Sequence, residues 1–257
     1  MDNNIAVYSL TALQGTNKAG LLSPDQDGYR TVVIGSLNAY NSWGAFYELE
    51  PARKFFDQSS SFQRRIANGA LYGELGHPRR MPNMSTEDFI NRILDVDEKN
   101  ICCHFRKVWL APGTTPDEEG RPVTVIMAEV KPWGPHAAVL EQAFQNKSQN
   151  VCFSIRSLTE DRIVGGTTIK ALRTIVCFDF VLEPGMSLAK KWHSPALEAL
   201  NDSLQQTYRF SEELLRQNCE QQESLGLESA TMARQVIEDF GWSVRSSFGP
   251  RPVSQTW

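Results

Sequence analysis

Apolar and polar positions alternate along the chain in a way that predicts short strands and helices. Runs rich in β-branched and aromatic residues predict strands at 31–37, 101–110, 122–130, 151–155 and 167–182. Helix-start and helix-stop signals predict helices at 52–56, 62–67 and 89–94, and apolar residues at helical spacing predict one at 135–146. The first thirty residues are polar and contain glycine, so we expect them to be irregular.

Local turn signals suggest how these elements are connected. The acidic segment 111–121, which contains Gly and Pro, joins strands 101–110 and 122–130, so it predicts a hairpin with a long exposed loop. Val164-Gly165-Gly166 predicts a turn between the last two strands. Ser85 to Asp88 has the spacing of a capping box and predicts a helix start.

The sequence changes character after the last predicted strand. Residues 195–222 are polar with regularly placed Leu, which predicts a long exposed helix, and 229–240 predict another. The final dozen residues read as a loose tail. We therefore expect a mixed α/β body over residues 1–190 and a C-terminal helical extension over 191–257.

Composition narrows the class of protein. The chain has 257 residues, of which 41% are apolar, so it can bury a substantial core. It carries 26 basic and 30 acidic side chains, a net charge of -4, which argues against a nucleic-acid binder. No apolar run is long enough to span a membrane, and the N-terminus lacks the features of a secretory signal. Five Cys without a Cys-x-x-Cys pair indicate reduced thiols in a cytosolic compartment.

Histidine is scarce, so a histidine-based site has few candidates: His77, His104, His136 and His193. His77 lies in Gly73-Glu-Leu-Gly-His-Pro78, where glycine and proline can hold the backbone and direct the ring at a cleft. Taken alone, this segment favours an ordinary surface-loop histidine.

Asp179 is the strongest physical signal, because it interrupts the apolar run 175–182. A carboxylate is costly to bury without a partner. It could orient a histidine, as in a Ser-His-acid triad, or it could face solvent, and the pattern alone does not decide. Ser154 and Arg156 share one face of their strand, which fits either an oxyanion site or an exposed edge strand.

Metal and phosphate sites are poorly supported. Cys102, Cys103 and His104 are adjacent in a strand, so they alternate between its faces and cannot all bind one ion. Gly165-Gly166 is too short for a phosphate-binding loop. We therefore predict no metal and no cofactor.

Three segments resemble one known family. Gly73 to Pro78 resembles the Gly-Glu-Leu-x-His-Pro signature of the prohead core proteases of large tailed bacteriophages. Phe153 to Leu158 resembles the nucleophile segment of that family, and Val176 to Val181 resembles its later strand that carries an Asp. Segments 41–56 and 131–144 are also similar to the family. The resemblance covers roughly residues 31–190, and the order and spacing of the motifs agree.

The resemblance implies a role for each matching residue. It makes Ser154 the nucleophile, His77 the general base and Asp179 the acid that orients the imidazole. Backbone N–H groups near Arg156 and Ser157, together with the Arg156 guanidinium, would form the oxyanion or substrate-binding site. Ser157 departs from the family, which has Gly there. The implied fold is α+β, a small assemblin-like β-barrel surrounded by helices.

The implied activity is that of a serine endopeptidase of capsid maturation. It would cleave scaffold, core and head proteins after Glu, inside the assembling prohead in the host cytoplasm. Self-processing between Glu228 and Ser229 is one interpretation of the Gly226-Leu-Glu228 segment, and an ordinary turn between helices is the other. Assemblin-like proteases often dimerise, so a dimer is an alternative to a monomer.

Two other functions compete with this one. A non-catalytic core or scaffold protein of the prohead could retain the fold, and the acidic segment Asp117-Glu-Glu119 would suit packing among partners. A thiol enzyme using Cys152 is a further alternative, without support from a family motif. The presence of His77, Ser154 and Asp179 together favours the serine protease.

Overall fold

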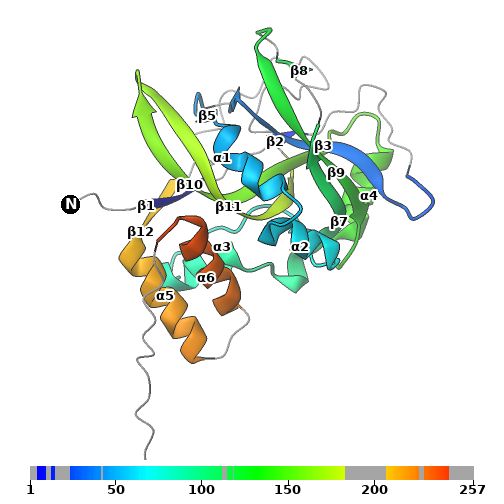
Figure 1. Ribbon diagram of the computed structural model, residues 1–257. Coiled ribbons are helices and arrows are strands. Elements are labelled where there is room, and N and C mark those ends of the chain that lie inside the picture. Colours follow the sequence, from blue (N-terminus) through cyan, green and yellow to red (C-terminus); the bar gives the residue numbers. More distant parts are fainter. Residues whose placement is uncertain are drawn as a thin grey trace, which may run out of the picture.

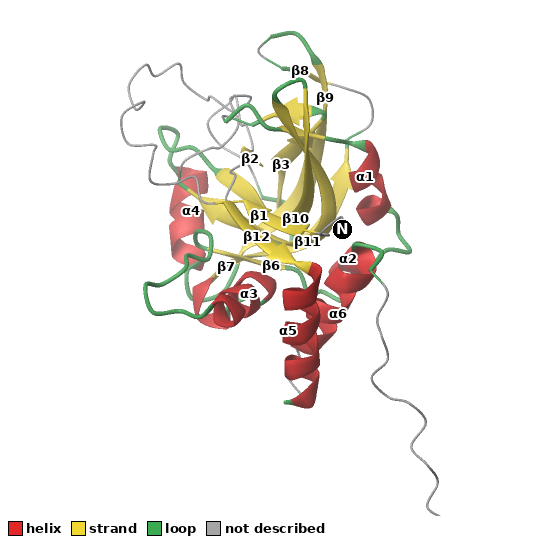
Figure 2. Cartoon of the chain, turned by 90° about the vertical axis from the view of Figure 1, so that its left-hand side faces the viewer, coloured by secondary structure: helices red, strands yellow, loops and turns green. Residues whose placement is uncertain are grey.

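Two sheets curl around a common core, and helices cover their outer side (Figures 1 and 2). The computed structural model describes residues 5–9, 13–14, 24–41, 43–111, 115–117, 119–182, 207–225 and 229–242. The predicted mixture of strands and helices is confirmed.

The first sheet is built on a long antiparallel hairpin, which projects as an arm in Figure 1. Its strands, in spatial order, are β12 (Thr207–Ser211), β1 (Ile5–Ser9), β10 (Cys152–Val164), β11 (Thr167–Val181), β5 (Phe46–Tyr47) and β4 (Ala39–Tyr40), and β2 (Leu13–Gln14) also pairs with β10. Gly165 and Gly166 form the turn of the hairpin with positive φ angles of 57° and 82°, as predicted.

The second sheet contains the predicted hairpin with the acidic loop. Its strands, in spatial order, are β3 (Arg30–Leu37), β9 (Pro122–Pro132), β7 (Ile101–Leu110) and β6 (Tyr72–Glu74), and β8 (Thr115–Pro116) pairs with β9. The two sheets meet where Leu75, directly after β6, bridges Phe180 of β11. This junction brings the segment after β6 to the end of the β10–β11 hairpin that lies away from the Gly165-Gly166 turn, where Phe180 pairs with Phe153.

Most of the predicted helices begin within a few residues of the expected position, but α5 begins at Glu212 and not near residue 195. They are α1 (Glu50–Arg53), η1 (Lys54–Phe56), α2 (Ser61–Ala67), α3 (Thr86–Leu94), η2 (Glu98–Asn100), α4 (Ala137–Gln145), α5 (Glu212–Ser224) and α6 (Ser229–Asp239). Ser85 caps α3, because its Oγ accepts a hydrogen bond from the Asp88 amide at 3.0 Å. Within the described residues, no helix is both long enough and apolar enough to cross a membrane.

Two predictions of secondary structure are wrong, and they concern segments that pair with each other. Ile5–Ser9 is strand β1, not irregular chain, and Thr207–Ser211 is strand β12, not part of a helix. Ile5 lies opposite Ser211 and Ala6 opposite Phe210 in antiparallel register. Because the two segments lie at opposite ends of the sequence, local periodicity could not reveal their pairing.

The described part of the C-terminal region packs on the rest of the molecule. Asn218 Nδ2 of α5 donates to Asn91 Oδ1 of α3 at 2.8 Å, and Lys54 Nζ donates to the Asp239 carbonyl at 3.1 Å. Val236 and Ile237 of α6 are buried in the common core. Residues 183–206 and the final tail lie outside the described residues, so the domain boundary at residue 190 stays a prediction.

Candidate active site

The register of the β10–β11 hairpin places several polar residues on one face. Ser154 lies directly opposite Asp179, and Arg156 lies opposite Cys177. Side chains of cross-strand partners point to the same face, as do those of residues two apart along a strand. The predicted shared face of Ser154 and Arg156 therefore also contains Asp179.

A β-bulge in strand β11 interrupts the pairing directly after Arg156. Ser157 pairs with Ile175, which leaves Val176 as the extra residue on β11. The Val176 carbonyl accepts a hydrogen bond from Arg65 Nη1 at 2.8 Å. The bulge thus interrupts the regular ladder immediately beside Arg156.

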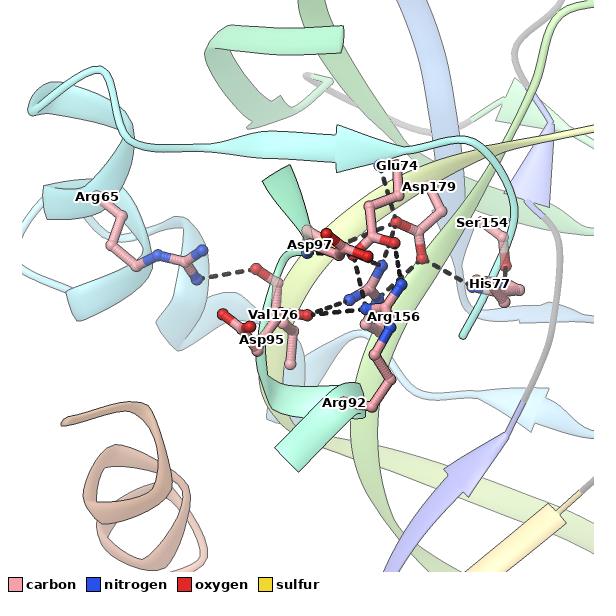
Figure 3. A network of polar contacts seen from close by, with 11 residues as sticks. Arg65, Glu74, His77, Arg92, Asp95, Asp97, Ser154, Arg156, Val176 and Asp179 are labelled. Atoms are coloured by element: carbon pink, nitrogen blue, oxygen red, sulfur yellow. Dashed lines mark hydrogen bonds and ion pairs between the residues drawn. The ribbon is translucent and has the colours of Figure 1, made fainter. Parts of the chain in front are cut away.

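The segment Gly73 to Pro78 brings His77 to this face. A Cβ on Gly73 would lie 2.1 Å from the Phe178 carbonyl oxygen, so only glycine allows β6 to approach β11 so closely. The Gly76 amide then donates to the Phe180 carbonyl at 2.7 Å, and its positive φ of 79° turns the chain. His77 follows this turn, and its ring lies between Ser154 and Asp179 (Figure 3).

Both ring nitrogens of His77 have partners. Nδ1 contacts Asp179 Oδ2 at 2.9 Å, and Nε2 is in hydrogen-bond contact with Ser154 Oγ. An ionised carboxylate only accepts hydrogen bonds, so Nδ1 must carry the proton. In the neutral ring, Nε2 is then free to accept the hydroxyl proton of Ser154. The geometry suits removal of that proton by the imidazole.

Asp179 is wholly buried, which rules out the solvent-facing interpretation. Burial alone would raise its pKa, but the charge of Arg156 and hydrogen bonds from His77 and Arg156 outweigh this, and the pKa lies well below its usual value. Arg156 donates from Nε to Oδ2 at 2.9 Å and from Nη2 to Oδ1 at 2.7 Å. The Glu74 amide adds a hydrogen bond to Oδ1 at 3.1 Å.

The Arg156 guanidinium, which the sequence suggested for the oxyanion or substrate-binding site, binds the Asp179 carboxylate in this structure. The side chain is fully buried, and Nη1 also donates to the Asp95 carbonyl at 2.8 Å. Burial opposes its charge, but the carboxylates of Asp179 and Glu74 keep its pKa well above the ordinary value. Ser157 is buried at the bulge, and its role at an oxyanion site stays a prediction.

A second buried carboxylate, that of Glu74, contacts the same network, and the sequence did not predict this. It makes a two-pronged ion pair with Arg92 of α3, with Arg92 Nη1 donating to Oε1 at 2.9 Å. Arg156 Nη2 lies 2.9 Å from the same oxygen, and the Asp97 amide donates to it at 2.9 Å. Glu74 belongs to the signature segment, but the sequence gives no signal that connects it with Arg92.

The nucleophile candidate is closed off from solvent in this structure. Ser154 is 0% exposed, and the His77 side chain is 10% exposed. Strand β1 pairs with β10 at Leu158 and Thr159, and β2 pairs with it at Cys152 and Phe153, on either side of Ser154. A substrate carbonyl can therefore reach Ser154 Oγ only after covering atoms move.

The other histidines have different surroundings. His104 Nδ1 contacts the Tyr29 hydroxyl at 2.8 Å, and its Nε2 contacts the Gly69 carbonyl at 3.1 Å. His136 precedes α4, and its amide donates to the Ile101 carbonyl. His193 lies outside the described residues.

The cysteines are all free and buried: Cys102, Cys103, Cys152, Cys177 and Cys219. Among the residues that the structure describes, no group of His, Cys, Asp and Glu side chains has the arrangement of a metal site.

The candidate cleavage site is only partly described. Glu228 lies outside the described residues, whereas Ser229 is the first residue of α6.

The sequence of this chain matches one known peptidase family, and it is similar to phage proteins. The model of the peptidase S80 family matches residues 8–238. A capsid maturation protease of Pseudomonas phage phiKZ is 33% identical over 256 residues, which cover 97% of this chain and 93% of the relative. Among solved structures, the capsid assembly protease of bacteriophage T4 is similar over 70% of this chain and 100% of its own, with 13% identity and a TM-score of 0.49.

Proposed function

Because this chain belongs to the peptidase S80 family, we propose that it is a serine endopeptidase of phage capsid maturation. The observation that carries the catalytic type is the contact of His77 with both Ser154 and Asp179. Hydroxyl, imidazole and buried carboxylate are joined in the order that nucleophilic catalysis by serine requires.

The reaction follows from this geometry. Ser154 Oγ attacks the scissile carbonyl carbon while His77 Nε2 takes the hydroxyl proton, and Asp179 stabilises the resulting imidazolium. The tetrahedral intermediate collapses, the C–N bond breaks, and His77 returns the proton to the leaving amine. A water molecule, deprotonated by the same imidazole, then hydrolyses the acyl-enzyme and restores Ser154.

The oxyanion needs hydrogen-bond donors near Ser154. Arg156 is engaged with Asp179, so we assign it to positioning that carboxylate. The remaining candidates are backbone N–H groups around Ser157, where the bulge interrupts the ladder. One such donor contributes about 2.7–4 kcal/mol to transition-state stabilisation.

The substrates would be scaffold, core and capsid proteins of the assembling head. The relative from phage phiKZ is named a capsid maturation protease, which supports this class of substrate. Cleavage after Glu, an assemblin-like fold and action inside the prohead follow the family resemblance. A homodimer stays a prediction on the same basis.

Self-processing between Glu228 and Ser229 is part of the proposal. The bond would lie between α5 and α6, directly before the first residue of α6. Cleavage there would separate residues 229–257 from the rest of the chain.

Coexpression with the phage head proteins tests the proposal against the non-catalytic alternative. We expect shortened head proteins with the wild-type chain and none with Ser154→Ala. Shortening that persists with Ser154→Ala would refute the serine mechanism. Intact head proteins in both cultures would favour a non-catalytic core protein that retains the fold.

A further inference from the structure

We propose that Glu74 and Arg92 are positioning residues, which fix the Arg156–Asp179 pair and thereby orient His77. This inference rests on the proposed function and extends it to residues with no assigned role. Neither side chain contacts the reacting atoms; both would act through a chain of buried contacts (Figure 3).

The contacts run without interruption from α3 to the imidazole. Arg92 donates hydrogen bonds to both carboxylate oxygens of Glu74, and Glu74 Oε1 lies 2.9 Å from Arg156 Nη2. Arg156 binds both oxygens of Asp179, and Asp179 Oδ2 accepts from His77 Nδ1. Each group therefore has its orientation fixed by the next.

Glu74 holds Asp179 by a second route. Its backbone amide donates to Asp179 Oδ1, the same oxygen that Arg156 Nη2 contacts. Backbone and side chain of this one residue thus constrain the carboxylate from two directions. A substitution of Glu74 removes the ion pair of its side chain with Arg156 but keeps the hydrogen bond from its backbone amide to Asp179, so it tests the ion pair alone.

The end of α3 anchors the other side of the network. The Asp95 carbonyl, at the C-cap of α3, accepts from Arg156 Nη1 at 2.8 Å and from Arg92 Nη1 at 3.2 Å. Cations are stabilised at a helix C-terminus, where carbonyl groups lack helical partners. The helix therefore fixes both guanidinium groups relative to the sheet.

The burial of four charges argues for a positioning role. Glu74, Asp179 and Arg156 are 0% exposed, and the Arg92 side chain is 21% exposed. Buried ion pairs are poor sources of stability, because desolvation offsets their attraction. Arg156 and Asp179 already neutralise each other, so the added Glu74–Arg92 pair makes better sense as a constraint on geometry. Substitution of residues that orient metal ligands typically lowers metal affinity or activity about 10–100-fold, and we expect an effect of similar size for residues that orient His77.

Nitrogen NMR of protein labelled with ¹⁵N-histidine tests the positioning directly. With only four histidines, His77→Ala identifies the His77 signals. We expect wild-type His77 to show the single tautomer with the proton on Nδ1. In Arg92→Gln and Glu74→Gln we expect a mixture of tautomers, and Arg92→Lys, which keeps the charge, should fall between wild type and Arg92→Gln.

Peptide cleavage provides the second measurement. We expect Arg92→Gln to lower kcat about 10–100-fold with KM unchanged, as for loss of an orienting contact. Glu141→Gln is the matched control. Glu141 of α4 also binds both Nη atoms of a buried arginine, Arg30 of β3, at 2.7 and 3.0 Å, but this pair is not part of the network around His77. This control should keep the wild-type kcat and His77 signals, whatever its change in Tm.

The outcomes separate this inference from the proposed function. The inference is overturned if folded Arg92→Gln keeps the His77 signals and the kcat of the wild type. It is also overturned if this variant has a lower Tm but an unchanged kcat per folded molecule. If Glu74→Gln does not fold, the two Arg92 variants decide. If the wild-type chain cleaves nothing, the proposed function fails, and the NMR result alone decides whether Arg92 positions His77.

Discussion

Ser154 and Asp179 are direct partners across the β10–β11 hairpin, and each contacts a different nitrogen of the same imidazole. Their separation is set by the pairing of the two strands, so the positions of the hydroxyl and the carboxylate do not depend on His77. His77 follows strand β6 of the other sheet, and the bridge between Leu75 and Phe180 places it beside the hairpin.

Ser154→Ala and His77→Ala should each abolish cleavage while the fold persists. A nucleophile and its base act as a unit, so we expect a loss of about 10⁶-fold in kcat for either variant. Kinetics of peptide cleavage with circular dichroism as a fold control provide the check. A double variant much slower than either single variant would show that the two residues do not act together.

Asp179→Asn should damage both activity and stability. The neutral amide cannot hold the required tautomer, so we expect kcat to fall about 10⁴-fold, the size of effect that this change has in a Ser-His-Asp triad. It also deprives buried Arg156 of its main counter-charge, which costs about 3–5 kcal/mol in the free energy of unfolding. Peptide kinetics and urea unfolding measure the two effects, and a loss of only a few-fold in kcat would leave Asp179 a structural residue.

The stabilising effect of Asp179 should depend on pH. Its folded pKa lies below the unfolded value of about 3.9, so the unfolded chain binds the proton more readily. The contribution is therefore complete above about pH 5 and is lost as the pH falls below about 4 toward the folded pKa. Urea unfolding of wild type and Asp179→Asn should show a difference in free energy that narrows over this range. A constant difference would contradict the linkage.

Thiol reagents should leave the enzyme active. Burial raises the pKa of Cys152 to about 12 and that of Cys177 well above its usual value, so neither forms a thiolate near neutral pH. We expect iodoacetamide to modify neither thiol in the folded protein, as peptide mass mapping would show. Cys152→Ala should retain cleavage, and inactivation by this substitution in a folded protein would revive the thiol mechanism.

If the chain cuts itself after Glu228, the released segment should stay attached. Helix α6 would begin the fragment, and its Ala233, Val236 and Ile237 are buried against the rest of the molecule. We expect two masses under denaturing conditions but a single peak in native gel filtration. Ser154→Ala should remain one chain, and a wild-type chain that stays intact while it cleaves a peptide would exclude this processing site.

The sequence grouped His77, Ser154 and Asp179, which are in contact in the structure, but it did not predict the network of contacts behind them. The ordered motifs pointed to His77, Ser154 and Asp179, and the cost of a lone buried acid independently marked Asp179. The contact of Arg156 with Asp179 was not predicted, because a shared strand face does not say which neighbour the guanidinium contacts. Glu74 and Arg92 meet only through tertiary packing, so neither periodicity nor spacing could pair them.

The fold shows the same limit. Local signals found the capped helix α3 and the Gly165-Gly166 turn, because their determinants lie within a few residues. Strand β12 was missed because polar residues with spaced Leu also suit a helix. Its conformation is fixed by its distant partner β1, and helix α5 begins directly after it, at Glu212.

The pairing of the first strand with the last has a consequence for biosynthesis. In β1, Val7 pairs with Thr159 on one side, and Ile5 pairs with Ser211 on the other. A ribosome releases the N-terminus first, and contacts so distant in sequence form slowly. The sheet that carries Ser154 and Asp179 is therefore completed only after Thr207–Ser211 has been translated. In this order of events, the sheet around Ser154 and Asp179 stays incomplete while the residues before Ser211 are still being synthesised.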